Sequence, residues 1–241
     1  MIQKIEHVSQ KLIRLQRKGG VMKRQFLITH FQSFVFLVLP PAIFLFLAVM
    51  VFGCQKKQDE QSAKPTVTLE NLQTAHGREA RLAHTYNLFA DKLGKAGYKN
   101  VSRLYRAVGR SEEIHTALHA ALLKKNGVEP KAYEPTPVVV GTVVQTFHMA
   151  LSDEGIEVES MYPNLAKTAA MENFLEAAEQ FNHDKNADAQ HVTLFKDALD
   201  RGGSIPTVPY FICPQCGFIM TSDKTAECPE CHTPKAKFEK I

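Results

Sequence analysis

Two pairs of cysteines near the C-terminus have the spacing of a metal site. Cys213 and Cys216 form one C-x2-C pair, Cys228 and Cys231 form the other, and eleven residues separate the pairs. Each pair predicts a tight turn that presents two sulfurs, and four thiolates suit a tetrahedral metal ion. The ion is structural zinc or one redox-active iron, and this segment taken alone favours a zinc ribbon. Few aromatic residues surround the pairs, so the metal must contribute much of the folding energy.

A second group of potential ligands lies upstream in segments with helical periodicity. Glu112 and Asp188 each precede a histidine, His115 or His191, by three residues, which places carboxylate and imidazole on one helical face. One such motif is weak, because many surface helices contain it, but two that face further acids favour a metal site. Oxygen and imidazole ligands suit iron or manganese, and zinc also binds them. His119, one turn beyond His115, either contacts a metal ligand from behind or, more simply, is a packed or solvated histidine.

The helical segments explain why these acids are unusual. Apolar residues recur at steps of three and four in four segments, at 69–95, 98–126, 142–171 and 173–201. Each apolar stripe turns acidic in its middle, at Glu79, at Glu112, at Glu154 with Glu157, and at Asp188. A buried carboxylate is too costly to leave unpaired. Acids at one depth in four helices therefore indicate bound cations.

The connections between these segments predict a helical bundle. Short turns join the members of each pair, and a long connection at 126–141 joins the two pairs. Thr142 with Gln145 predicts a capping box that opens the third helix, and Gly202 with Gly203 predicts the end of the fourth. Two hairpins joined by a crossover favour a ferritin-like four-helix bundle.

An internal repeat relates the two halves of this bundle. Three residues recur with a displacement of 76, namely Tyr86, Glu112 and His115 as Tyr162, Asp188 and His191. The repeat supports Asp188 as the counterpart of Glu112 despite its shorter side chain. Tyr86 and Tyr162 lie a turn or two from the acids. They either donate hydrogen bonds to metal-bound carboxylates or are plain core tyrosines.

Charge is distributed unevenly along the 241 residues. The formal net charge is +4, but residues 1–54 contain seven Lys or Arg and one acid, so the remainder carries −2. The remainder has no basic patch that would indicate a nucleic-acid partner. A hydrophobic content of 44% and a charged content of 22% are typical of a globular protein.

The N-terminal segment indicates attachment to a membrane. Residues 34–52 are nineteen uncharged residues preceded by basic ones, which is long enough to span a bilayer. The sequence "VFGC" at 51–54 resembles the lipobox of bacterial lipoproteins, where the chain is cut before a cysteine that carries lipid. We expect a lipoprotein attached through Cys54, with an uncleaved anchor helix as the alternative. Both place the rest of the chain outside the cytoplasm, in the periplasm or on the outer face.

The two ligand sets together resemble the rubrerythrin family, in which a rubredoxin-like domain follows a ferritin-like di-iron bundle. Five segments between residues 71 and 239 carry the resemblance: E-x6-Y-x2-FA at 79–90, "EEIH", "EGIEVESMYP", "DAQH" and "CPECHTPKAKFE". The resemblance implies seven di-iron ligands, Glu79, Glu112, His115, Glu154, Glu157, Asp188 and His191. It also implies one iron at Cys213, Cys216, Cys228 and Cys231.

We therefore expect a mostly α protein with four parts. These are a signal or anchor segment at 1–54, a polar tether at 55–67, a ferritin-like bundle at 68–202 and a rubredoxin-like metal ribbon at 203–241.

The resemblance further implies a peroxidase. A diferrous pair would deliver two electrons to hydrogen peroxide, giving water, and the FeS4 centre would return electrons singly. It also implies a homodimer. Export departs from the family's cytosolic use of NAD(P)H-derived electrons, so a cytochrome or membrane donor would be needed. Two other functions stay open: an iron-handling ferroxidase of ferritin type, and a non-catalytic protein with a structural zinc ribbon.

Overall fold

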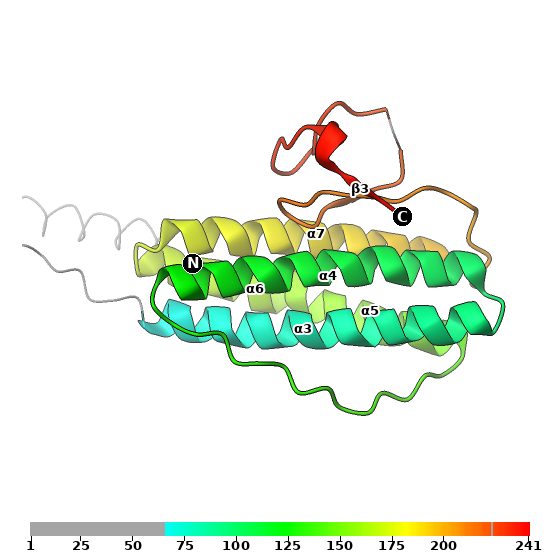
Figure 1. Ribbon diagram of the computed structural model, residues 1–241, viewed down its shortest axis with the longest axis horizontal. Coiled ribbons are helices and arrows are strands. Elements are labelled where there is room, and N and C mark those ends of the chain that lie inside the picture. The colour runs from blue at the N-terminus through cyan, green and yellow to red at the C-terminus, as the bar shows by residue number, and fades with distance from the viewer. Residues whose placement is uncertain (1–65, 223) are drawn as a thin grey trace, which may run out of the picture. The chain divides into compact units, whose positions relative to one another are not determined.

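Helices make up most of the chain that the computed structural model describes, which is residues 66–222 and 224–241. Four helical segments form a bundle and a small three-stranded domain follows them, which confirms the predicted fold class (Figure 1). No helix in these two ranges is both long and apolar enough to cross a membrane. The predicted signal or anchor segment and its Cys54 lie outside the described residues and stay predictions.

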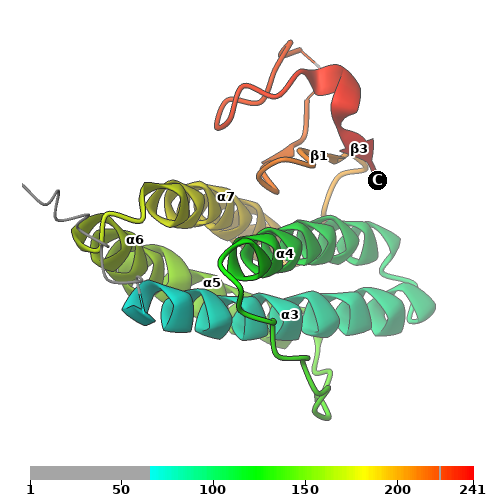
Figure 2. The same ribbon diagram turned by 60° about the vertical axis from the view of Figure 1, so that its left-hand side comes forward.

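The first hairpin pairs α3 (Thr66–Lys95) with α4 (Lys99–Lys125), and the two helices lie side by side in Figure 2. Gly97 in the turn has a φ of 97°, a conformation that glycine adopts without steric cost. The Ser102 hydroxyl donates to the carbonyl oxygen of Ala90 across 2.8 Å and joins the helices near this turn. The predicted first pair of helices is therefore present.

The second hairpin differs from the single helix predicted at 142–171. It contains α5 (Val143–Ile156), one turn of π-helix η1 (Glu157–Met161) and α6 (Tyr162–Met171) before α7 (Leu175–Asp200). The predicted capping box is confirmed, because Thr142 and Gln145 exchange side-chain-to-backbone hydrogen bonds. The π turn is the feature that helical periodicity did not predict.

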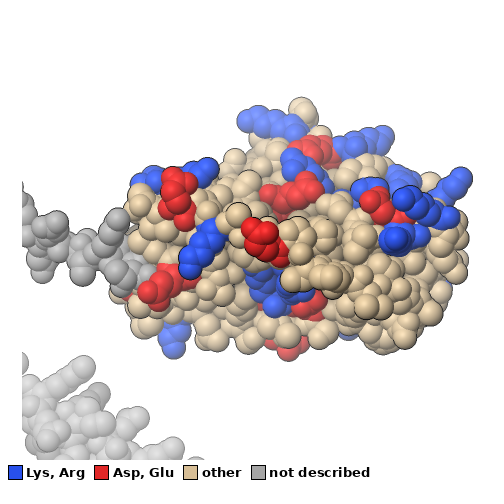
Figure 3. Space-filling view, turned by 60° about the horizontal axis from the view of Figure 1, so that its bottom comes forward, with Lys and Arg blue, Asp and Glu red and all other residues tan. Residues whose placement is uncertain are grey.

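A long crossover connects the hairpins. It leaves the end of α4 and runs the length of the bundle beside α3 to the start of α5 (Figure 1). The backbone amide of Lys131 donates to the Gln73 side chain of α3 across 2.9 Å, which fixes part of this path. On the face shown in Figure 3, basic and acidic side chains are interspersed.

Two apolar clusters lie within the bundle, one toward each end. One is built around Phe89, Tyr105 and Phe195, and the other around Leu72 and Phe181. Along α3 the second cluster ends at Ala75 and the first begins at Leu82, and Glu79 lies between them. The bundle therefore buries a polar layer between two apolar ones.

The C-terminal domain is a small antiparallel sheet in the order β2-β1-β3. Its strands are β1 (Phe211–Ile212), β2 (Ile219–Met220) and β3 (Glu239–Lys240), and a short 3-10 helix (Lys235–Lys237) precedes the last strand. Arg110 of α4 makes two 2.7 Å hydrogen bonds to the Glu239 carboxylate. This fork holds the edge of the sheet on the bundle.

Candidate metal centre

The polar layer contains all seven side chains that sequence reasoning selected, and each of them is completely buried. Six of them form two groups in which the potential ligand atoms lie within 4.8 Å of one another. The groups are Glu79, Glu112 and His115, and Glu112, Glu154, Asp188 and His191. Glu112 belongs to both groups, so its carboxylate lies where it can bridge two ions. Glu157 belongs to neither.

The two histidines face the shared carboxylates through Nδ1. His115 Nδ1 lies 2.9 Å from Glu112 Oε2, and His191 Nδ1 lies 3.1 Å from Glu112 Oε1. Asp188 Oδ1 is almost equidistant from the two rings, at 3.6 Å and 3.5 Å. The shorter side chain of Asp188 therefore reaches the same place between the histidines as Glu112 does from the opposite hairpin.

Two tyrosines donate hydrogen bonds to the carboxylates. The Tyr86 hydroxyl donates to Glu154 Oε1 across 2.7 Å, and the Tyr162 hydroxyl donates to Glu79 Oε1. Burial and the neighbouring carboxylates raise the pKa of both tyrosines well above 10, so both hydroxyls keep the proton they donate. Each half of the repeat thus orients an acid of the other half.

The π turn accounts for a one-residue irregularity in the repeat. Tyr86 follows Glu79 by seven residues, but Tyr162 follows Glu154 by eight. The backbone amide of Tyr162 donates to the carbonyl of Glu157, five residues earlier, which is the hydrogen bond of a π-helix. The wider turn absorbs the extra residue and keeps Tyr162 facing the cluster.

Glu157 is therefore the acid without a counterpart. It lies three residues after Glu154, and the residue three positions after Glu79 is the buried Leu82. Its partner is Arg78, which sequence reasoning missed: the Arg78 Nε donates to Glu157 Oε1 across 2.5 Å. Arg78 precedes Glu79 by one residue, so the acidic stripe gave no signal for it.

Asp184 is a second buried residue that sequence reasoning missed. One of its oxygens lies 2.8 Å from His119 Nε2, and the other accepts from Gln180 and lies 3.8 Å from His115 Nε2. Asp184 precedes Asp188 by four residues on the same face of α7, a spacing that would have revealed it. His119 is buried rather than solvated, and besides Asp184 it contacts the ring of Phe181.

The pKa shifts of the cluster show that its buried acids lack compensating positive charge unless cations are bound. Burial raises the pKa of Glu79, Glu157 and Asp188 well above the usual carboxyl range, and neighbouring acids raise it further. Although burial opposes it, His191 and His115 hold the pKa of Glu112 below its usual value. Burial lowers the pKa of His191, but Glu112 and Glu154 outweigh this and raise it to about 10.

The donor set fits a pair of metal ions. Oxygens of four acids are buried without a hydrogen-bond partner among the described residues: Glu79 Oε2, Glu112 Oε1, Glu157 Oε2 and both carboxylate oxygens of Asp188. Unpartnered buried carboxylate oxygens cost free energy, and bound cations satisfy them. Carboxylates with two imidazoles and no thiolate match iron or manganese.

The four cysteines converge as predicted on a tetrahedral metal site. Their sulfurs lie within 4.8 Å of one another, with Cys213 and Cys231 at 3.5 Å and Cys216 and Cys228 at 3.6 Å. A metal–sulfur bond of about 2.3 Å gives sulfur separations of about 3.8 Å in a tetrahedron. The neighbouring thiols of Cys216 and Cys228 lower the pKa of Cys213, so one thiolate is already favoured.

The first cysteine knuckle contacts the carboxylate–histidine cluster directly. His115 Nε2 donates to the carbonyl oxygen of Cys216 across 3.2 Å, and the Ser111 hydroxyl donates to that of Gly217 across 2.7 Å. Gly217 has a φ of 75°, and an added Cβ would lie 2.4 Å from His115 Nε2. Only glycine allows this approach.

Comparisons with known proteins match both parts of the chain. A family model described as Rubrerythrin matches residues 70–199. Rubrerythrin-2 of Clostridium acetobutylicum is 28% identical over 181 residues, which are 74% of this chain and 98% of that protein. Nigerythrin of Nitratidesulfovibrio vulgaris is 28% identical over 173 residues, which are 71% of this chain and 85% of that one.

Solved structures give the same match at the level of the fold. Nigerythrin in its fully reduced, all-ferrous state has a TM-score of 0.68 at 27% identity, covering 72% of this chain and 86% of its own. A bacterioferritin of Desulfovibrio desulfuricans has a TM-score of 0.55 at 19% identity over 59% of this chain and 85% of its own. The second likeness supports the helical bundle alone.

Proposed function

Because this chain belongs to the rubrerythrin family, whose members are di-iron oxidoreductases, we propose that it reduces hydrogen peroxide to water with electrons that enter through its four-cysteine domain. The carboxylate–histidine cluster is a di-iron site, and the four cysteines form the metal site of a rubredoxin-like domain. We assign the seven predicted side chains as iron ligands, and Tyr86 and Tyr162 as donors that orient two of them.

One observation carries the proposal, namely the hydrogen bond between His115 and the carbonyl of Cys216. Cys216 offers its sulfur to the ribbon metal, and His115 offers Nδ1 to the bundle metals while Nε2 donates to the ribbon backbone. The path between the two metal sites therefore consists of the His115 side chain, one hydrogen bond and Cys216. An iron-storage protein needs no such connection, so the contact favours electron transfer over the ferroxidase alternative.

The chain's own residues prepare the site for a two-electron reduction. Two ferrous ions, when bound, supply two electrons to the O–O bond, and two protons complete the formation of two water molecules. The five carboxylates and two imidazoles hold the ions in a layer closed by apolar clusters. Tyr86 and Tyr162 fix two carboxylates by hydrogen bonds that survive at neutral pH.

The proposal is tested by mixing anaerobically reduced, iron-loaded protein with a limiting amount of hydrogen peroxide. We expect one peroxide to be consumed for every two electrons lost, with the ribbon centre reoxidised through the bundle. A Glu112→Ala variant removes the carboxylate common to both ligand groups. In that variant the ribbon centre should stay reduced when peroxide is added.

Three outcomes would contradict the proposal. Reoxidation of the ribbon centre at the same rate in Glu112→Ala would mean that peroxide attacks the ribbon directly. Zinc in the four-cysteine site of protein from iron-replete anaerobic cells would remove the electron-transfer role. Uptake and oxidation of many ferrous ions per chain by oxygen, without peroxide turnover, would favour the ferroxidase alternative.

We also propose that the protein works outside the cytoplasm as a membrane-attached homodimer. The lipobox-like "VFGC" sequence ending at Cys54 supports the attachment, and the family resemblance supports the dimer. At that location an electron donor other than cytosolic NAD(P)H must reduce the ribbon, such as a cytochrome or a membrane-bound carrier.

A further inference from the structure

The ion pair between Arg78 and Glu157 lies at the edge of the di-iron site. The Glu157 side chain is completely buried, and the Arg78 side chain is 21% exposed, so the guanidinium reaches inward from the surface of α3. Its Nε donates to Glu157 Oε1, and its terminal nitrogen donates to the backbone carbonyl of Asp153 across 2.9 Å. Two hydrogen bonds therefore fix Arg78 against the segment in which α5 becomes the π turn.

Only one of the two carboxylate oxygens of Glu157 has a hydrogen-bond partner among the described residues. Its Oε1 is bound by Arg78, whereas its Oε2 is buried without a hydrogen-bond partner among the described residues. It is also the one predicted ligand outside both compact groups of ligand atoms. A carboxylate held in this way has a single oxygen left for a metal ion.

The charges of the layer give Arg78 a further role. The repeat supplies four carboxylates in matched pairs, Glu79 with Glu154 and Glu112 with Asp188, and these balance two ferrous ions. Glu157 adds a fifth carboxylate that has no counterpart in the first half. Its negative charge is uncompensated in a buried layer unless a cation lies beside it, and Arg78 is that cation.

We propose that Arg78 is a positioning residue of the di-iron site: it holds Glu157 by one oxygen and cancels the charge of this fifth carboxylate. Through Glu157 it limits that ligand to one oxygen and raises the reduction potential of the iron pair. The inference rests on the di-iron site and not on peroxide as the substrate.

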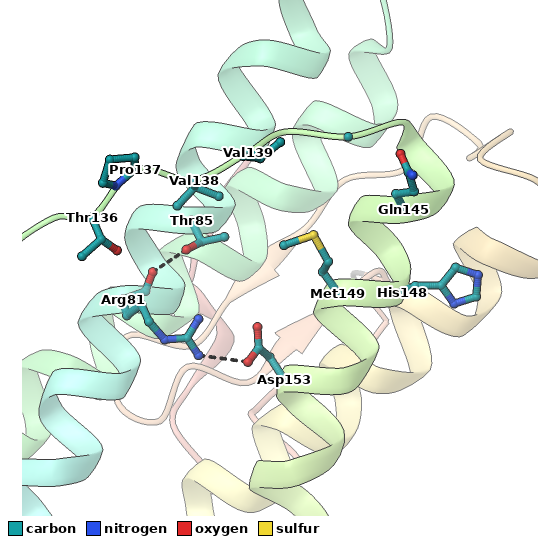
Figure 4. A pocket seen from close by; sticks show the side chains of 11 residues that line it. Arg81, Thr85, Thr136, Pro137, Val138, Val139, Gln145, His148, Met149 and Asp153 are labelled. Atoms are coloured by element: carbon teal, nitrogen blue, oxygen red, sulfur yellow. Dashed lines mark hydrogen bonds and ion pairs between the residues drawn. The ribbon is translucent and has the colours of Figure 1, made fainter.

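Arg81 provides a matched control one turn along the same helix. Its terminal nitrogen lies 2.9 Å from Asp153 Oδ1, and Figure 4 shows this pair at a surface pocket of about 610 Å³ beneath the crossover. Arg78 contacts the same Asp153 oxygen at 3.4 Å but alone extends to Glu157. The two arginines therefore share a charge and a neighbour and differ in contact with the cluster.

The experiment is a redox titration of iron-loaded full-length Arg78→Gln, Arg78→Lys and Arg81→Gln, with the ribbon centre as internal reference. Removing a nearby positive charge favours the ferric form. We expect Arg78→Gln to lower the potential of the iron pair and alter its Mössbauer spectrum without moving the ribbon potential. Arg78→Lys should restore the potential in part, and Arg81→Gln should leave it unchanged.

A double variant separates positioning from folding. In a Glu157→Gln background the carboxylate that Arg78 holds and balances is gone, so Arg78→Gln should shift the potential by less than it does in the wild type. If Arg78→Gln alone fails to bind two irons, Arg78→Gln/Glu157→Gln should recover them. The inference is overturned if Arg78→Gln keeps the wild-type potential and spectrum, or if Arg81→Gln shifts the potential equally. It is also overturned if Arg78→Gln shifts the potential as much in the Glu157→Gln background as in the wild type, since additive effects would mean that the two residues act independently.

Discussion

His115 and Cys216 share a hydrogen bond of 3.2 Å although they lie 101 positions apart in the chain. The donor is a ring whose other nitrogen faces the carboxylate cluster, and the acceptor belongs to a residue whose sulfur faces the ribbon metal site. The contact exists because Gly217 lets the knuckle backbone approach α4. Its dependence on one missing side chain makes it testable.

Gly217→Ala should separate the two metal sites without emptying them. The added Cβ would lie 2.4 Å from His115 Nε2 and 2.6 Å from Ser111 Oγ, so the knuckle must shift. We expect both sites to keep their metals while peroxide-driven reoxidation of the ribbon slows on the order of tenfold to a hundredfold, as measured by stopped-flow absorbance. Gly77→Ala is the control, because its Cβ meets nothing within 4 Å. Equal rates in wild type and Gly217→Ala would show that electrons take another path.

Asp188→Ala should lose bundle iron while the ribbon spectrum stays intact. Asp188 lies between His115 and His191 with both oxygens free to bind, so its removal leaves a gap in the ligand set. Asp188→Glu should keep two irons and peroxide reduction. Asp197→Ala, which removes an exposed acid of the same helix, serves as control. Two irons per chain and wild-type turnover in Asp188→Ala would exclude Asp188 as a ligand.

Tyr162→Phe should weaken iron binding by roughly 10- to 100-fold, because it removes the hydrogen bond that orients Glu79. The carboxylate left buried without that donor should also cost about 1–3 kcal/mol of unfolding free energy. Tyr86→Phe should act similarly through Glu154. Competition with a chelator and thermal melts give the two quantities. Tyr98→Phe, at an exposed position, should change neither, and an unaffected Tyr162→Phe would make this tyrosine a simple core residue.

Removal of the metals should make stability fall as pH rises. Glu79, Glu157 and Asp188 have folded-state pKa values raised above the unfolded ones, and His191 is raised from 6.5 to about 10. In each case the folded state binds protons more tightly, so stability is lost from about pH 4.5 upward and through pH 10. Glu112 has a lowered pKa and opposes this only at acid pH.

Chemical denaturation of metal-free and Fe(II)-loaded protein between pH 5 and 9 measures the effect. We expect the stabilisation by Fe(II) to grow with pH, because protons and metal ions compete for the same oxygens. A metal-free protein that is equally stable across this range would mean that the acids are not held together as the structure has them.

Cys54→Ala tests the membrane attachment. If Cys54 is lipidated, the wild-type protein should partition with membranes after processing, and Cys54→Ala should remain unprocessed at higher mass. Mass spectrometry of both fractions measures the difference. Identical mass and processing in the two proteins would leave the uncleaved anchor helix as the explanation for membrane association.

Periodicity was enough to predict the helices, the acidic layer and the cysteine site, because each depends on spacing within one segment. It was not enough for Arg78, which lies off the acidic stripe and pairs with a residue 79 positions away. The contact of Gly217 with His115 likewise joins distant segments that share no period. Asp184 could have been predicted, because it lies one helical turn before Asp188 on the same stripe, but it was overlooked.

The π turn has a consequence for how this chain can change over generations. An inserted residue in an α-helix rotates everything after it by about 100°, which would turn Tyr162 away from Glu79. Here the insertion is confined to Glu157–Met161, so Asp188 and His191 downstream keep their places. One extra residue in this helix is therefore compatible with an intact metal site. The two halves of the repeat therefore differ in spacing by one residue and still bring a tyrosine and an acid each to the same cluster.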